Sequence, residues 1–155
     1  MAIEHPGVVS DHDDDRAWAT GVVDASPHEV FEFLRRPANH RTINGDRSVR
    51  GTVNDGSPLE LGSTFGMKMS LFVPYRITSK VVEFEQDRLI AWAHIGGHRW
   101  RWELAPARDD RATVTETFDL TTARFPSGLR LLGYPGRHAG NVASSVAALR
   151  AHFEH

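Results

Sequence analysis

The sequence predicts an α+β domain in which an antiparallel sheet packs against a long C-terminal helix. Between residues 48 and 120, segments of alternating apolar and polar residues follow one another with short turns between them, as antiparallel strands do. A capped amphipathic helix near residue 27 precedes most of these segments. Near the C-terminus, apolar residues recur at intervals of four, three and four, which indicates a final helix.

Composition limits the classes of function. The 155 residues fit one domain, and a net charge of −2 gives no electrostatic basis for binding nucleic acid. The absence of cysteine excludes disulfides, thiol nucleophiles and cysteine-based zinc sites, and we expect a cytoplasmic protein. No apolar run approaches the ~20 residues of a membrane span, so no integral membrane segment is predicted.

The first fifteen residues are expected to form a disordered polar leader. They contain no apolar segment like that of a signal peptide, and they end in the run Asp11-His12-Asp13-Asp14-Asp15. The folded domain is then expected to span residues 16–155 as a single unit.

The clearest local signal marks a helix that follows a strand at 17–23. Ser26 is a typical N-cap residue, Pro27 suits the first helical position, and Glu29 lies three residues after the cap as in a capping box. An amphipathic stripe follows, and it consists of Val30, Phe31 and Leu34. Proline at position 37 ends the helix, and a short helical turn is expected over 38–44.

The remaining strands are expected at 48–53, 64–72, 75–85, 89–95, 98–104 and 112–120. Together with the first strand they give a sheet of about six or seven strands. Val142, Val146 and Leu149 then share one helical stripe between residues 138 and 153, and His138 lies one turn earlier on the same line. We expect this helix to cover one face of the sheet.

The stretch 98–104 carries two of the four tryptophans on one face. Because side chains alternate along a strand, Trp100 and Trp102 point the same way as His98 and Leu104. The opposite face, expected to be solvated, carries Arg99, Arg101 and Glu103. Paired tryptophans can be plain core, or they can be the wall of a cavity for a flat apolar molecule.

The predicted register of the last hairpin brings a carboxyl group to this aromatic face. If Leu104 pairs near Ala112, then Glu116 lies opposite Trp100. A carboxylate on the inward face must be paired, hydrogen-bonded or protonated. Glu116 therefore either pairs with an arginine or tyrosine, or points out at the open end of the sheet, or serves to fix a ligand hydroxyl or to act as an acid or base.

The preceding hairpin allows two loop lengths. A three-residue loop, which we favour, pairs His94 with His98 and turns Trp92 inward, whereas a two-residue loop exposes Trp92. Together with Glu116, the two histidines resemble a metal site or an acid–base pair. Residues beside a hairpin turn more often lie at the solvent edge, so we predict no metal.

Several segments in order resemble one protein superfamily. These are residues 22–34, the Leu61-Gly62-Ser63-Thr64-Phe65 segment, the turn 85–89, and Trp102-Glu103-Leu104 followed by 113–116. The chain is similar over residues 17–153 to the START-like superfamily, also called SRPBCC, of polyketide cyclases, dehydrases and lipid-transport proteins. The resemblance implies a helix-grip fold: a curved antiparallel sheet wraps around the C-terminal helix and encloses an apolar cavity. Members bind lipids, polyketides or other apolar molecules, and a minority catalyse cyclisation or dehydration.

The leading hypothesis is a protein that binds an apolar small molecule, such as a lipid, polyketide or aromatic metabolite, without a metal or organic cofactor. The expected ligand contacts are Phe65, Met67, Met69, Trp92, Trp100, Trp102, Glu116, Tyr134, His138, Val142, Val146 and Leu149. Residues 129–134 are expected to cover the site. One alternative is a cyclase or dehydratase that uses Glu116 with His94 or His98, and another is a protein-binding regulator without a small ligand. Either a monomer or a homodimer is compatible with the sequence.

Overall fold

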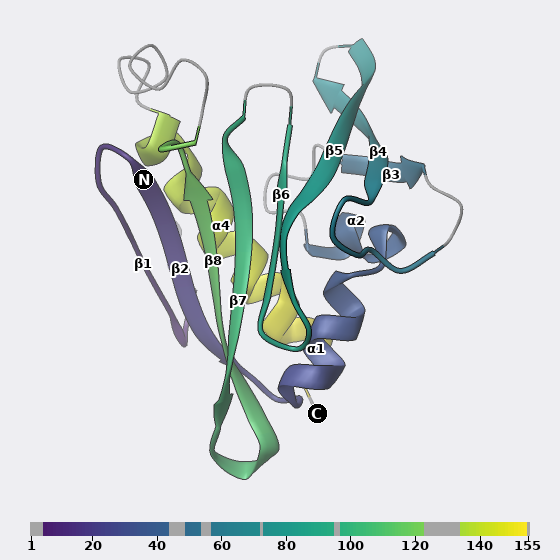
Figure 1. The fold of residues 1–155 in the computed structure, drawn as a ribbon. Helices are drawn as coiled ribbons and strands as arrows, with labels where there is room; N and C mark the ends of the chain where they lie inside the picture. Colours follow the sequence, from purple (N-terminus) through teal and green to yellow (C-terminus); the bar gives the residue numbers. More distant parts are fainter. Residues whose placement is uncertain are drawn as a thin grey trace.

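The computed structural model describes residues 5–43, 49–53, 57–71, 73–94, 97–122 and 134–154. Within them, eight strands form one sheet in the order β1-β2-β8-β7-β6-β5-β4-β3, and every neighbouring pair is antiparallel (Figure 1). The strands are β1 Val8–His12, β2 Arg16–Val23, β3 Val49–Val53, β4 Thr64–Leu71, β5 Val73–Glu85, β6 Leu89–Ala93, β7 Arg99–Ala107 and β8 Arg111–Asp119.

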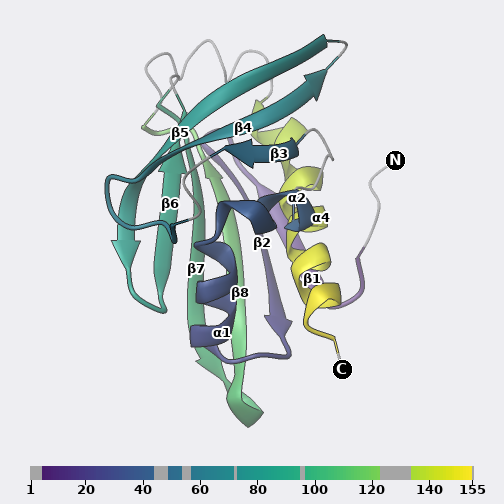
Figure 2. The same cartoon turned by 90° about the vertical axis from the view of Figure 1, so that its right-hand side faces the viewer.

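The helices lie against one face of this sheet. They are α1 Pro27–Leu34, α2 His40–Ile43 and α4 Tyr134–His152, and short 3₁₀ turns occupy η1 Pro37–Asn39 and η2 Arg108–Asp110. The long helix α4 packs along β1, β2 and β8, whereas α1 contacts β7 and β8. The curvature of the sheet around this helical layer is visible in Figure 2. The predicted α+β helix-grip architecture is confirmed.

The structure corrects the predicted leader. Residues 8–12 form edge strand β1, which pairs with β2 from Val8 opposite Gly21 to His12 opposite Ala17. The acidic run turns the chain, because the Asp13 carboxylate accepts hydrogen bonds from the backbone amides of residues 15 and 16, each at 2.8 Å. Arg150 on α4 donates to the carbonyls of residues 6 and 22 and so ties the hairpin to the helix. This strand is the one by which the sheet exceeds the expected number.

Both ends of α1 are capped by side chains. The Ser26 hydroxyl accepts from the amide of Glu29 at 3.2 Å, and the Glu29 carboxylate accepts from the amide of Ser26 at 3.4 Å, which confirms the capping box. At the other end, Asn39 donates to the Phe33 carbonyl at 3.0 Å. His40 donates to the carbonyl of residue 34 at 2.9 Å.

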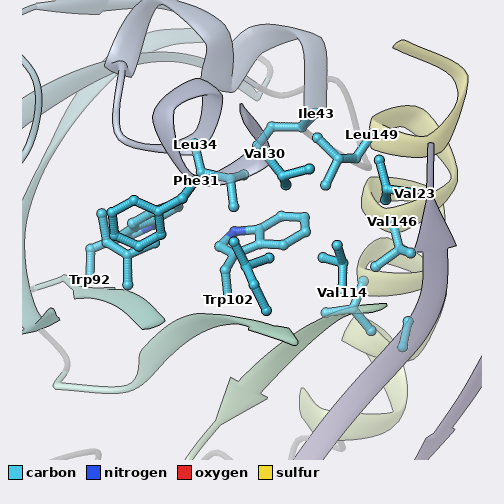
Figure 3. Close-up of a cluster of buried hydrophobic side chains, with 14 of the residues drawn as sticks. Val23, Val30, Phe31, Leu34, Ile43, Trp92, Trp102, Val114, Val146 and Leu149 are labelled. Carbon is cyan, nitrogen blue, oxygen red and sulfur yellow. The ribbon is translucent and has the colours of Figure 1, made fainter. Parts of the chain in front are cut away.

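The hydrophobic core lies between the sheet and the helices. Figure 3 shows Trp102 amid side chains from α1, α4 and the neighbouring strands, with Trp92 and Phe31 on one side and Val114 on the other. Trp102 is only 2 % exposed. The α1 stripe is buried as predicted, and it covers this tryptophan from the helical side.

The register of the last hairpin differs from the prediction by two residues. Leu104 pairs with Val114, so that Glu116 lies opposite Trp102 and not Trp100. The cause is the length of the strands: β7 continues to residue 107 and β8 begins at 111, across a segment predicted to be a loop. Asp109 in η2 turns the chain with a φ of 60°. Because a shift of two residues preserves the face, the inward orientation of Glu116 is confirmed.

The outward face of β7 is not simply solvated, as had been expected. Arg101 donates to Glu83 at 2.8 Å and to Asp119 at 3.1 Å, and its side chain is 15 % exposed. Arg99 donates to the same Glu83 at 2.9 Å. Burial opposes ionisation of Asp119, but hydrogen bonds from Thr121 and Arg101 outweigh burial and lower its pKa. Of the three residues expected to be solvated, only Glu103 is exposed.

We expect Asp119→Ala to lower the free energy of unfolding by about 2 kcal/mol, because it removes the buried partner of Arg101 while Glu83 still holds the guanidinium. Urea unfolding followed by circular dichroism measures the effect. Glu103→Ala on the same face is the matched control and should change stability by less than about 0.5 kcal/mol. Equal effects of the two substitutions would contradict this account of the network.

Candidate ligand-binding site

The β6–β7 hairpin brings two histidines together on the inner face. Trp92 pairs with Trp100, and the same register places His94 beside His98, with ring centroids 5.6 Å apart. Trp92 is 6 % exposed. These contacts confirm the prediction that a three-residue loop turns Trp92 and His94 inward, although residues 95 and 96 of that loop lie outside the described part of the chain.

His94 is held as a neutral imidazole. Its Nδ1 atom lies 2.6 Å from the hydroxyl of Ser79, which is fully buried on β5. Burial, aided by repulsion from His98, lowers the pKa of His94 to about 4. Burial also lowers the pKa of His98. Both rings therefore act as hydrogen-bonding groups near neutral pH, and neither supplies a positive charge.

An aromatic cluster lies beside this pair and joins the sheet to α4. Phe118 on β8 is its centre: the ring centroid of Trp100 lies 4.7 Å away, that of His98 5.2 Å and that of His138 4.3 Å. His138, on α4, also meets the Trp100 ring edge to face at 5.1 Å. Phe118 is fully buried, whereas Trp100, His98 and His138 are half-buried. Solvent partly reaches all three side chains, of which Trp100 and His138 were predicted as ligand contacts and His98 as a candidate acid or base.

Glu116 lies two residues before Phe118 on β8, at the next position whose side chain points inward. It is 4 % exposed, and it lies between Trp102 on β7 and Ala19 on β2. Burial raises the pKa of its carboxyl group well above the usual value, and a hydrogen bond with Ser145 of α4 offsets only part of that effect. Its Oε2 atom is buried, and no residue in the described part of the chain forms a hydrogen bond with it. The pairing with an arginine or tyrosine that the sequence left open is not found among the described residues.

The other predicted contacts divide into two groups. Apolar side chains that are nearly or completely buried pack within the core, and these are Phe65, Trp92, Trp102, Val142, Val146 and Leu149. The side chains of Met67, Met69 and Tyr134 lie outside the part of the structure that is described, as does most of the segment expected to cover the site. Their roles as contacts stay predictions.

The structure does not place Glu116 beside the two histidines. His98 precedes β7, and its position in the ladder corresponds to residue 120, four residues from Glu116 along β8. Four residues of strand span about 13 Å. This separation weakens the hypothesis that Glu116 works with His94 or His98 as an acid–base pair.

His40 is an inner-face histidine that was not among the predicted site residues. It is 4 % exposed, and its ring stacks on Trp92 with centroids 4.6 Å apart. Its Nδ1 atom is buried and has no hydrogen-bond partner within the ranges that the structure describes. The sequence placed His40 on a short helical turn but gave no sign of burial, because the ring is covered by residues distant in the chain, such as Trp92 on β6 and Phe65 on β4.

One group of described residues has the donor types of a metal site, at the exposed end of α1. Ligand atoms of His28, Glu32 and Asp87 lie within 4.8 Å of one another. His28 contacts Asp87 at 2.9 Å, and Gln86 donates to Asp87 at 2.8 Å and to Glu32 at 3.3 Å. These contacts account for the cluster as a surface hydrogen-bond network.

Comparison with known proteins identifies the family. Residues 16–154 match the family described as polyketide cyclase / dehydrase and lipid transport. The chain belongs to this family. Its curated relatives include two uncharacterized proteins of Mycobacterium tuberculosis, from strains H37Rv and CDC 1551, which are 39 % and 38 % identical over 129 residues, or 82 % of this chain. The chain spans 58 % of the length of these relatives.

Solved structures share the fold at low sequence identity. A Nitrosomonas europaea protein aligns with a TM-score of 0.68 and 13 % identity over 91 % of this chain and 95 % of its own. The Aha1 dimer from Colwellia psychrerythraea aligns with a TM-score of 0.59 and 16 % identity over 90 % and 96 % of the two chains. Among the helices described in the present structure, none is long and apolar enough to cross a membrane.

Proposed function

We propose that this protein binds a small, mainly apolar molecule between the sheet and the helices, with Glu116 as a polar contact. The observation that carries the proposal is the buried carboxyl group of Glu116, one oxygen of which has no hydrogen-bond partner among the described residues of a largely apolar interior. Leaving such a group unsatisfied costs about 1–3 kcal/mol. A ligand that hydrogen-bonds to Glu116 would recover that free energy.

The aromatic cluster supports the same proposal. Trp100, His98 and His138 are half-buried around Phe118, and Glu116 lies two residues from Phe118 along the same face of β8. Two residues of strand correspond to about 7 Å, which is within the length of a small aromatic molecule. A ligand lying against the aromatic cluster would therefore reach the carboxyl group with its polar end.

Native mass spectrometry of freshly purified protein tests the proposal most directly. We expect the chain to carry a small molecule that dissociates on denaturation. Titration with palmitate, a flavonoid and an aromatic polyketide should also change tryptophan emission and raise the melting temperature for at least one of them, because Trp100 lies in the proposed site. No bound molecule together with no response to any of the three compounds would count decisively against binding.

Substitution of Glu116 should change the stability of the fold in a pH-dependent way. We expect Glu116→Gln to raise the free energy of unfolding at pH 7 by roughly 2 kcal/mol, because a neutral amide avoids the penalty of burying an ionisable group. Urea unfolding at pH 7 and pH 4.5 measures this gain. The gain should shrink at pH 4.5, where the carboxyl group is increasingly protonated in the unfolded chain as well.

Ligand affinity should differ between two replacements of Glu116, by glutamine and by leucine. Glu116→Gln keeps a donor and an acceptor and should retain ligand affinity within a few fold, whereas Glu116→Leu should lose about tenfold. Glu103→Gln on the exposed face is the matched control and should change neither affinity nor stability. Unchanged affinity in Glu116→Leu would remove Glu116 from the site. Loss of a catalysed turnover in Glu116→Gln without loss of binding would instead favour the cyclase or dehydratase alternative.

A further inference from the structure

The tautomer of His40 is fixed by the end of α1. Its Nε2 atom lies 2.9 Å from the carbonyl oxygen of Leu34, and a carbonyl can only accept, so Nε2 carries the hydrogen. Burial lowers the pKa of His40 to about 4, and the bond to Leu34 opposes that effect only in part. The ring is therefore neutral at pH 7, and its Nδ1 atom presents a lone pair that can only accept a hydrogen bond.

Helix capping explains only one of the two ring nitrogens. Asn39 gives the neighbouring carbonyl of Phe33 the same kind of cap at 3.0 Å, and it does so from a half-buried position. The imidazole of His40 additionally places Nδ1 in the interior, where no group in the described part of the chain donates to it. A buried acceptor without a donor is destabilising, and the described residues supply no donor, so a bound molecule could provide one.

The surroundings of His40 define what kind of partner fits. The ring lies nearly parallel to Trp92, with an interplanar angle of 19°, and meets Phe65 edge to face at 5.2 Å. Trp92 is the cross-strand neighbour of Trp100, which belongs to the aromatic cluster of the proposed site. The ring of His40 thus covers one face of Trp92, and the aromatic packing continues from Trp92 across β6 and β7 to the half-buried Trp100.

We propose that His40 is a specificity-determining residue whose Nδ1 atom accepts a hydrogen bond from a hydroxyl group of the bound molecule. The inference rests on the proposed function and narrows its ligand class to compact aromatic molecules that carry a phenol-type hydroxyl. Such a molecule offers a flat face to the half-buried Trp100 and a donor to His40. A fatty acid bound as its carboxylate offers no donor, so it would leave Nδ1 unsatisfied.

Two probes that differ in one donor test the proposal. β-Naphthol and its methyl ether share the ring system and the oxygen atom, but only the naphthol can donate. We expect calorimetric titration to give an affinity about tenfold higher for β-naphthol with the unmodified chain, since one buried hydrogen bond is gained. In His40→Phe the ratio of the two affinities should fall to near one. In Asn39→Ala, which removes only a helix cap, the ratio should be unchanged.

A measurement on the unmodified chain guards against misfolding of the variant. Nitrogen NMR of ring-labelled histidine reports hydrogen bonding at His40 Nδ1 directly. The signal should move on addition of β-naphthol and stay in place on addition of the ether. Equal affinities for the two probes, or an unmoved signal, would overturn the role of His40 while leaving small-molecule binding intact. Failure of both probes to bind would overturn the phenol-type ligand class, and binding of palmitate alone would leave only the proposed function standing.

Discussion

Trp102→Ala is expected to lower the free energy of unfolding by about 3–5 kcal/mol. The indole is 2 % exposed, and side chains of α1 such as Val30 and Leu34 lie over it, with Val114 beside it on β8 (Figure 3). Truncation would remove apolar burial and leave a cavity that these neighbours, fixed on separate elements, could fill only in part. Urea unfolding followed by circular dichroism at pH 7 measures the loss.

Trp100→Ala is the matched comparison, because Trp100 is two residues away on the same face of the same strand. Its ring is half-buried and contacts Phe118 and His138, at the partly solvent-exposed end of the inner face. We expect a smaller loss, about 1–2 kcal/mol, together with a loss of ligand affinity. Losses of the same size would show that both tryptophans are core residues and would contradict the division between core and site.

The sequence sufficed for the orientation of side chains on the sheet. Period-two alternation depends on backbone geometry alone, so Trp100, Trp102 and Glu116 point inward although the predicted register was wrong by two residues. The capping box at Ser26 was equally secure, because it depends on residues three apart in the chain.

Features that depend on contacts between residues far apart in the chain could not be predicted from the sequence. Strand β1 forms because the Asp13 turn returns the chain along β2 and because Arg150, over 130 residues later, donates to the carbonyl of residue 6 just before β1. The side chain of Arg101 is partly buried because it forms ion pairs with Glu83 and Asp119 on two other strands. The importance of His40 depends on where α2 packs. None of these partners could be chosen by spacing along the chain.

The core residues and the residues of the proposed site lie on the same face of the sheet, and they differ in how far their side chains are buried. Val142, Val146 and Leu149 of α4, predicted as ligand contacts, are fully buried in the core, whereas His138 one turn earlier on the same helix is half-buried among aromatic rings. A stripe at helical spacing predicts only which side faces the sheet. The spacing does not show which end of the stripe lies in the core and which lies among aromatic and polar side chains. That depends on how the histidines are arranged in three dimensions.

Acid should destabilise the fold through its buried histidines. Burial lowers the pKa values of His40 and His94 to about 4, below the ordinary 6.5 of the unfolded chain. The unfolded state therefore binds more protons as the pH falls below 6.5, and the stability present above 6.5 is lost progressively down to about pH 4. At pH 5 we expect each histidine to cost about 2 kcal/mol relative to pH 7.

Glu116 acts in the opposite direction. Its raised pKa means that the folded state retains a proton that the unfolded state releases above about pH 4.5, so lowering the pH from 7 to 5 relieves its penalty. Urea unfolding of the unmodified chain at the two pH values should thus show the histidine loss reduced by the glutamate gain. Glu116→Gln should lose more stability over this interval, and His94→Gln should lose less. A pH dependence that none of the three replacements, His40→Gln included, alters would mean that these buried groups do not govern the acid sensitivity of the fold.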